Sequence, residues 1–208
     1  MSEYEVIAQA RKGDQGAFTA LVHSYQNAIY SLCYRMLGNA EQAEDAAQET
    51  FLRAYTQLHR YDPERPFKTW LFAIASHYCI DRLRRRRVTW LDIDDEPLAG
   101  HPALRERRAG PEEAALHRER AVDVQALLEY LPPKDRAAVV MLYWYDLSYQ
   151  EIAEVTGTTV SAVKSRLHRA RVALAEAMSG NSSGKAAVQP AARPQTAPAA
   201  PAFTLAWA

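Results

Sequence analysis

The sequence lacks any long apolar run. Its longest one, AAVVMLYWY at 137–145, falls short of the roughly 18 to 20 residues that a membrane-spanning helix needs. The first residues, MSEYEVIAQARKG, carry acids where a signal peptide carries positive charge, and they contain no apolar core of the kind such a peptide needs. From these two absences we expect a cytoplasmic protein with no membrane insertion.

Cysteine is scarce as well. The 208 residues include two, Cys33 and Cys79, which match no metal-binding or redox spacing. The six histidines form no HExxH motif or paired-ligand array, so we expect neither a metal nor another cofactor. There is also no P-loop, no GxSxG and no Cys–His–acid set, because helical positions place His77 and Cys79 on different faces. We therefore expect no enzyme, and we interpret both cysteines as reduced core residues.

Net charge is missing too, although charged residues are abundant. Lys and Arg number 25, Asp and Glu number 25, and the net charge is zero. A neutral average argues against nucleic-acid binding. The charges are sorted into blocks, however: 41–49 is acidic, 82–87 is rich in arginine, 92–96 is acidic and 164–171 is basic. This pattern suits a protein with two kinds of partner.

Alternating patterns typical of β-strands are absent, and apolar residues recur at three- and four-residue steps, so we predict an all-α fold. Asp14 can cap a long helix, Gly38 can end it, and Asn39 can cap the next. After two prolines, the pattern predicts a further helix over 67–87, either continuous or jointed near His77.

The chain divides into two small helical domains. From 88 to 111 the helical periodicity is lost among acids, prolines and glycines, which is typical of a flexible linker. The last thirty residues are built from Ala, Pro, Ser and Gly and are predicted to be disordered. We therefore predict domains at 1–89 and 112–178, a flexible acidic linker at 90–111 and a tail at 179–208.

The second domain contains a helix-turn-helix pattern within 148–178. Ser148 precedes a short helix, Gly157 suits a left-handed turn, and Thr159 can cap a second helix. At about 100° per residue, the apolar residues of that helix share one side and face the core. The other side and its margins carry donors for base edges and phosphates. The candidate duplex-binding residues are Ser161, Lys164, Ser165, Arg166, His168, Arg169 and Arg171.

Two stretches of the first domain, EDAAQETFLRAY at 44–55 and FKTWLFAIASHYCIDRLRRRR at 67–87, complete a wider pattern. Together with the helix-turn-helix they resemble the extracytoplasmic-function (ECF, group IV) sigma factors of bacterial RNA polymerase, over about residues 8–178. The resemblance implies a sigma region 2-like bundle, a sigma region 4-like domain and a role in promoter recognition and transcription initiation, in a stress or envelope response. The partners it implies are core RNA polymerase (β and β′ subunits), promoter DNA and an anti-sigma factor.

The resemblance also implies roles for single residues. The helix that buries Phe51 would dock on the coiled coil of the β′ subunit, and residues 67–87 would bind the −10 promoter element and capture an unpaired base along a basic track. The helix-turn-helix would read the −35 element. The implied polymerase-binding residues are Asp45, Gln48, Glu49 and Arg53, and the implied −10 residues are His77, Tyr78, Arg82, Arg84, Arg85, Arg86 and Arg87. Many relatives carry Asn, which reads the unpaired base, at the position of His77. The base that His77 would select is therefore left open.

Other interpretations fit parts of the sequence. A stand-alone helix-turn-helix regulator would explain 148–178 but would leave 41–58 and 67–87 without a role, and it predicts tight duplex binding without polymerase. A nuclear localisation signal would explain the arginine run, but such a signal belongs in an exposed tail. Under the sigma interpretation, the linker acids would occupy a polymerase channel meant for nucleic acid. These acids are Asp92, Asp94, Asp95 and Glu96.

Overall fold

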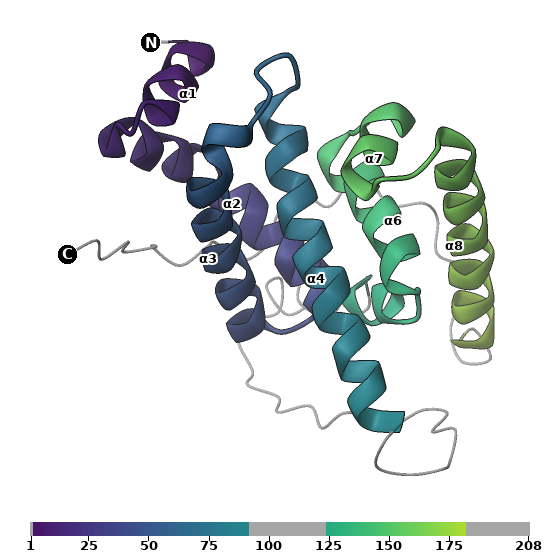
Figure 1. Ribbon diagram of the computed structural model, residues 1–208. Helices are drawn as coiled ribbons and strands as arrows, with labels where there is room; N and C mark the ends of the chain where they lie inside the picture. The colour runs from purple at the N-terminus through teal and green to yellow at the C-terminus, as the bar shows by residue number, and fades with distance from the viewer. Residues whose placement is uncertain (1, 92–123, 182–208) are drawn as a thin grey trace, which may run out of the picture.

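A computed structural model describes residues 2–91 and 124–181, and every regular element in these ranges is helical. This confirms the predicted all-α fold. The first range contains α1 (Glu3–Arg11), α2 (Gln15–Leu37), α3 (Ala40–Gln57), the 3-10 turn η1 (Leu58–Arg60) and α4 (Phe67–Leu91). The second contains a short helix at 124–129, then α6 (Pro133–Tyr145), α7 (Tyr149–Thr156) and α8 (Val160–Asn181) (Figure 1). Most of the predicted linker, including Asp92, Asp94, Asp95 and Glu96, and most of the predicted tail lie outside the described residues.

The capping residues predicted from the sequence set the helix boundaries. The carboxylate of Asp14 accepts a hydrogen bond from the backbone N–H of Ala17 at 2.9 Å. Gly38 ends α2 with a φ of +74°, a left-handed conformation that glycine adopts without steric cost. A Cβ at this position would lie 2.4 Å from Oε1 of Glu129. Glycine, which has no side chain, therefore also lets the second half of the chain pack closely here. Asn39 caps α3 in the same way as Asp14 caps α2.

The helix that begins at Phe67 is continuous and has no joint at His77. It ends at Leu91, past the predicted end at Arg87. No proline or glycine interrupts residues 67–91, and arginine is among the better helix formers. The helix therefore extends into the first two residues of the predicted linker.

Phe51 lies in the core of the first half, as the sequence led us to expect, together with aromatic residues of α4. Phe51 is 3% exposed and Phe72 is fully buried. Trp70 is partly buried and packs in an aromatic cluster with neighbouring rings of the 61–67 segment. Cys33 and Cys79 are both buried and both are free thiols, which confirms their interpretation as reduced core residues.

The two halves pack directly against each other, which was not among the expectations from the sequence. In Figure 1, α6 lies between α4 and α8, and it contacts α2 and α4 as well as α7 and α8. The hydroxyl of Tyr145 on α6 donates to the backbone carbonyl of Ala28 at 2.8 Å. Its ring meets that of Phe72 edge-on, with centroids 4.7 Å apart. Lys68 Nζ donates to the backbone carbonyl of Tyr145 at 3.1 Å. Buried residues of both halves form one cluster.

A buried arginine joins helix ends from both halves. Arg136 of α6 is 5% exposed. Its guanidinium donates to the backbone carbonyl of Met36 near the end of α2, and to the carbonyls of Glu129 and Leu131. A cation is favourable at the C-terminal ends of helices, where backbone carbonyls lack helical partners. Arg136 therefore stabilises the contact between the halves.

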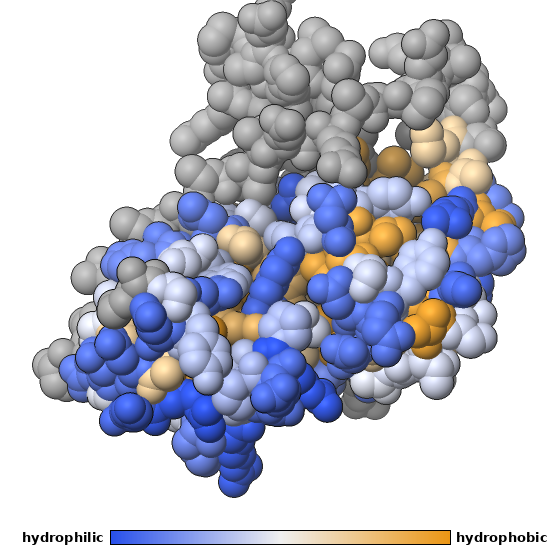
Figure 2. Space-filling view, turned by 90° about the horizontal axis from the view of Figure 1, so that it is seen from above, coloured by the Kyte–Doolittle hydropathy of each residue, from blue (hydrophilic) through white to orange (hydrophobic). Residues whose placement is uncertain are grey.

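The face of the molecule drawn in Figure 2 is mainly polar. Figure 2 shows hydrophilic residues over most of one face, with hydrophobic residues gathered toward the side on which Figure 1 places α6, α7 and α8. Among the described helices, none combines the length and the apolar character needed to cross a membrane.

Candidate functional site

One face of α3 carries acids beside an exposed leucine. Asp45, Gln48, Glu49 and Leu52 follow the spacing i, i+3, i+4 and i+7, which places them together on the helix surface. The side chain of Asp45 is 57% exposed, and Leu52 is 46% exposed. An apolar centre with a polar rim is the usual composition of a protein interface. We call these four residues the α3 acidic face.

Leu52 was not among the predicted polymerase-binding residues. Leu52 lies four residues after Gln48 and three after Glu49, which places it on the same side of the helix as the predicted contacts, and this spacing was the available signal. In the structure the core-facing residues of α3 are buried, whereas Leu52 is exposed beside the predicted contact residues.

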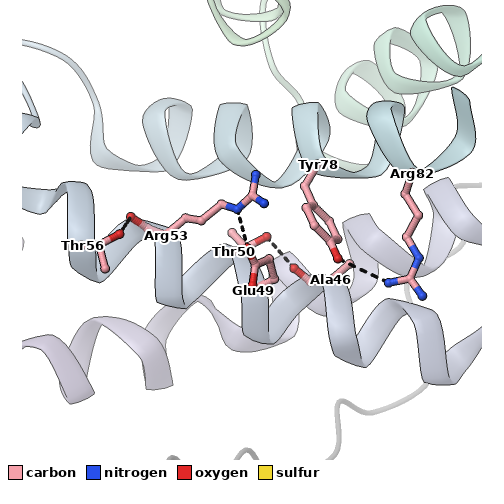
Figure 3. Close-up of polar contacts among 7 residues, drawn as sticks. All are labelled: Ala46, Glu49, Thr50, Arg53, Thr56, Tyr78 and Arg82. Carbon is pink, nitrogen blue, oxygen red and sulfur yellow. Dashed lines mark hydrogen bonds and ion pairs between the residues drawn. The ribbon is translucent and has the colours of Figure 1, made fainter. Parts of the chain in front are cut away.

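Contacts between α3 and α4 connect this face with the predicted −10 residues. Figure 3 draws two of the hydrogen bonds involved, Arg53 to Glu49 within α3 and Arg82 to Tyr78 within α4. Arg53 Nε donates to Glu49 Oε1 at 2.6 Å, and the Arg53 guanidinium lies 4.9 Å from the ring centroid of Tyr78. One terminal nitrogen of Arg82 lies 3.5 Å from Asp45 Oδ2, and the other donates to the Tyr78 hydroxyl at 3.4 Å. Residues predicted for two different partners therefore contact each other.

The other predicted −10 residues lie along α4. His77 is exposed, and so are the three arginines that follow one another at 84–86. Arg86 also donates to Oε1 of Gln42 on α3 at 3.3 Å. The side chain of Arg87 lies outside the described residues, although its backbone belongs to α4. The predicted basic track is therefore exposed at Arg84, Arg85 and Arg86.

The second half contains the predicted helix-turn-helix, formed by α7 and α8. Gly157 ends α7 with a φ of +59°, in the left-handed region. The hydroxyl of Thr159 accepts a hydrogen bond from the N–H of Ala162 at 3.2 Å and so caps α8. Val163 and Leu167 are buried beneath α8, as the helical wheel predicted. The motif and the buried side of its second helix are therefore confirmed.

Ser148 and Glu151 form a capping box at the start of α7. The Ser148 hydroxyl accepts from the N–H of Glu151 at 3.2 Å, and the Glu151 carboxylate accepts from the N–H of Ser148 at 2.8 Å. The hydrogen bonds from Ser148 lower the pKa of the Glu151 carboxyl below its ordinary value of 4.5. A lowered carboxyl pKa stabilises the fold above the unfolded-state pKa, and this contribution is lost as the pH falls through the lower, folded-state value.

Replacing Ser148 by alanine is expected to lower the free energy of unfolding by about 1 kcal/mol at neutral pH, because an N-cap is lost. The pKa of Glu151 should move back toward 4.5. Urea unfolding and an NMR titration of Glu151 measure the two effects. An unchanged titration of Glu151 in the variant would show that Ser148 does not hold its carboxylate.

The outer side of α8 carries the residues predicted to bind duplex DNA. Arg166 is half-buried, and one of its terminal nitrogens is buried without a hydrogen-bond partner among the described residues. Lys164 and His168 have no side-chain hydrogen bond or ion pair within the described part of the chain. The exposed residues are Ser161, Lys164, Ser165, His168, Arg169 and Arg171.

Some of these side chains also hold the domain together. Arg169 donates two hydrogen bonds to the carboxylate of the buried Asp135, at 3.2 Å each. Arg171 Nε donates to the hydroxyl of Tyr143 at 3.3 Å, and this hydrogen bond is the largest cause of a raised pKa of Arg171. The Ser165 hydroxyl donates to the backbone of α8 itself. Lys164, His168 and the smaller Ser161 are therefore the side chains of this surface most available to a ligand.

Comparisons with known proteins match both halves of the chain. Residues 21–89 match Sigma-70 region 2, and residues 121–174 match Sigma-70, region 4. The ECF RNA polymerase sigma factor SigW of Bacillus subtilis is 41% identical over 172 residues, which are 81% of this chain and 92% of that protein. The RNA polymerase sigma-H factor of Pseudomonas aeruginosa is 34% identical over 181 residues, which are 85% of this chain and 93% of that protein.

Two solved structures share the fold. CnrH, solved in complex with the cytosolic domain of CnrY, has a TM-score of 0.64 and 27% identity, covering 86% of this chain and 98% of that one. The sigma factor RpoE of Bartonella quintana, solved with the anti-sigma factor NepR, has a TM-score of 0.59 and 22% identity, covering 78% of this chain and 96% of that one.

Two promoter-binding domains of the sigma type, in this order, define a transcription initiation factor. The chain belongs to the ECF RNA polymerase sigma factors. It binds core RNA polymerase, recognises promoter DNA and directs transcription initiation. A stand-alone helix-turn-helix regulator is not favoured, because the match over 21–89 gives the first half its own role in initiation.

Proposed function

We propose that this sigma factor docks on the β′ subunit of core polymerase through the α3 acidic face, with Arg53 at its edge, and reads promoter DNA through α4 and α8. The observation that carries this assignment is the separation of the surfaces. In Figure 1, α3 and α8 lie at opposite sides of the molecule, with α4 and α6 between them. The acids of α3 are thus kept apart from the cations of α8, and each surface suits its own partner.

The proposed −10 surface is the exposed side of α4. An unpaired base needs a polar reader and an aromatic or apolar wall, while its backbone needs cations. His77 is exposed and can donate or accept hydrogen bonds. Tyr78 lies beside it, and the arginines at 84–87 continue the same helix. We therefore assign base reading to His77 and backbone contacts to the arginines.

The proposed −35 surface is the outer side of α8. A recognition helix places its exposed residues in the major groove, where donors meet base edges and marginal cations meet phosphates. Among the described residues, Lys164 and His168 have no side-chain hydrogen bond or ion pair, which suits base contacts. Arg169 and Arg171 are held by Asp135 and Tyr143, which suits phosphate contacts at fixed positions. We assign further phosphate contacts to Ser161, Ser165 and Arg166.

The two domains must separate to reach both promoter elements. Helices pack about 8–10 Å apart, so two packing steps, from α4 through α6 to α8, span roughly 20 Å. The −10 and −35 elements are named for their positions, which are about 25 base pairs apart. At about 3.4 Å per base pair, this is roughly 85 Å. We propose that the packed arrangement is the free factor, with domains at 1–89 and 112–178 that separate on the promoter.

We also propose that an anti-sigma factor controls this protein in the cytoplasm, in a stress or envelope response. Among proteins of this fold, CnrH was solved with the cytosolic domain of CnrY, and RpoE with the anti-sigma factor NepR. A packed pair of domains offers such a partner one continuous surface to hold. Co-purification with a candidate partner that suppresses transcription would support this part of the proposal.

Run-off transcription tests the main proposal. Core polymerase is combined with a promoter library in the presence and absence of the protein, and the start sites are sequenced. We expect defined starts with the protein and none without it, and loss of selectivity at the −35 positions when Lys164 and His168 are both replaced by alanine. Absence of added initiation, with tight duplex binding by the protein alone, would instead indicate a stand-alone regulator.

A further inference from the structure

The guanidinium of Arg82 on α4 is paired with a carboxylate of the α3 acidic face. One of its terminal nitrogens lies 3.5 Å from Asp45 Oδ2, and the other donates to Tyr78. The side chain of Arg82 is 30% exposed, so most of its surface is already covered within the molecule. A carboxylate and a phosphate present the same kind of anionic acceptor to a guanidinium. Asp45 therefore holds the position at Arg82 that a DNA phosphate would take.

Tyr78 is covered in a corresponding way. The guanidinium of Arg53 lies 4.9 Å from the ring centroid, on the face of the ring. Nucleic-acid bases stack on the faces of aromatic rings, and guanidinium groups occupy the same position. Glu49 fixes Arg53 through a hydrogen bond of 2.6 Å (Figure 3). A planar group of α3 therefore covers the ring face on which a base would stack.

We infer that in the free factor α3 acts as an internal substitute for the promoter strand, with Asp45 in place of a phosphate and Arg53 in place of a base. The inference rests on the proposed function, since Asp45 and Glu49 are also the proposed polymerase contacts. Polymerase that engages these two acids withdraws them from Arg82 and Arg53. Docking on polymerase and release of the −10 surface are then the same exchange of partners.

Asp45→Asn tests the phosphate half of this inference. The full chain, without polymerase, is titrated against a fluorescent single-stranded oligonucleotide of mixed sequence over a range of salt concentrations. We expect the variant to bind up to about fivefold more tightly, because exposed ion pairs are weak. We also expect the plot of log K against log salt to steepen by about 0.7, the value for one added phosphate contact on a single strand.

Glu41→Gln is the matched control. Glu41 is an exposed acid of the same helix, so its replacement makes the same change in charge without freeing Arg82. The steeper salt dependence should be specific to Asp45→Asn and should vanish when Arg82→Ala is added. Equal affinities and equal slopes for Asp45→Asn and Glu41→Gln would overturn the phosphate half. Run-off transcription by the wild type decides the proposed function separately, because the oligonucleotide assay contains no polymerase.

Arg53→Met tests the base half. Removing a cation lowers the affinity for any oligonucleotide, so the readout is a ratio of two affinities. The affinity for the normal oligonucleotide is divided by that for an abasic strand of equal length. We expect this ratio to rise about threefold or more in the variant, because base stacking on a freed ring is worth about fivefold or more per base. The rise should be absent in Arg53→Met/Tyr78→Ala, and an unchanged ratio in Arg53→Met would overturn this half.

Discussion

Replacing Leu52 by asparagine is expected to weaken the binding of core RNA polymerase about thirtyfold, or by about 2 kcal/mol. Leu52 is 46% exposed at the centre of the α3 acidic face, so a partner can still bury about half of its side chain. The variant loses this apolar burial and brings an amide into the interface without a prepared hydrogen-bond partner. The fold itself should tolerate the change, since exposed substitutions rarely alter stability by more than about 0.5 kcal/mol.

Competition binding with labelled wild-type factor and purified core polymerase measures this effect. Tyr4→Asn is the control, because Tyr4 is an apolar residue of the same half that is 68% exposed and belongs to a different helix, α1. Circular dichroism should show equal helix content and equal melting for both variants. Equal polymerase affinity for Leu52→Asn and the wild type would remove Leu52 from the interface and count against docking through this face of α3.

The local structure could be predicted because short-range chemistry determines it. Asp14, Asn39, Ser148 and Thr159 cap helices through their own side chains within three residues, and Gly157 takes a left-handed turn that few other residues tolerate. The buried sides of the helices followed from spacing alone. Family resemblance supplied the order of the domains, and the matches over 21–89 and 121–174 confirmed the family.

The packing between the halves could not be predicted in the same way, because it depends on residues far apart in sequence. One indication was present in α6, where AAVVMLYWY is apolar on every side of the helix. A helix with this character is normally buried all round. The structure shows why, since α6 contacts α2 and α4 as well as α7 and α8. Its apolar run is explained by two interfaces, one within its own half and one with the other.

The candidate site was predicted as separate sets of residues, and the structure brings two of these sets together. Asp45, Glu49 and Arg53 were assigned to polymerase, whereas Tyr78 and Arg82 were assigned to DNA, yet all five form one group between α3 and α4. Helical spacing within each element gives the face of a residue but not its partner on another helix. For the same reason, the pairing of Arg169 with Asp135 was visible only in the structure.

Replacing Tyr145 by alanine is expected to destabilise the packed factor by about 3 kcal/mol, as truncation of a large aromatic side chain usually does. The variant loses the hydrogen bond to Ala28 and the edge-to-face contact with Phe72. Burial raises the pKa of the Tyr145 hydroxyl, so the group keeps its proton and donates at neutral pH. At roughly 2–4 °C per kcal/mol for a chain of this size, the Tm should fall by about 6–12 °C.

Transcription should respond differently from stability. If the domains separate on the promoter, the contacts of Tyr145 with Ala28 and Phe72 are absent in the active complex. Run-off yield from Tyr145→Ala should then equal or exceed that of the wild type at a temperature well below the variant's Tm. Tyr130→Ala, at a residue 73% exposed, should change neither the Tm nor the yield. A folded Tyr145→Ala variant that fails to initiate would show that the packed arrangement is needed for initiation, and the proposed separation of the domains would be wrong.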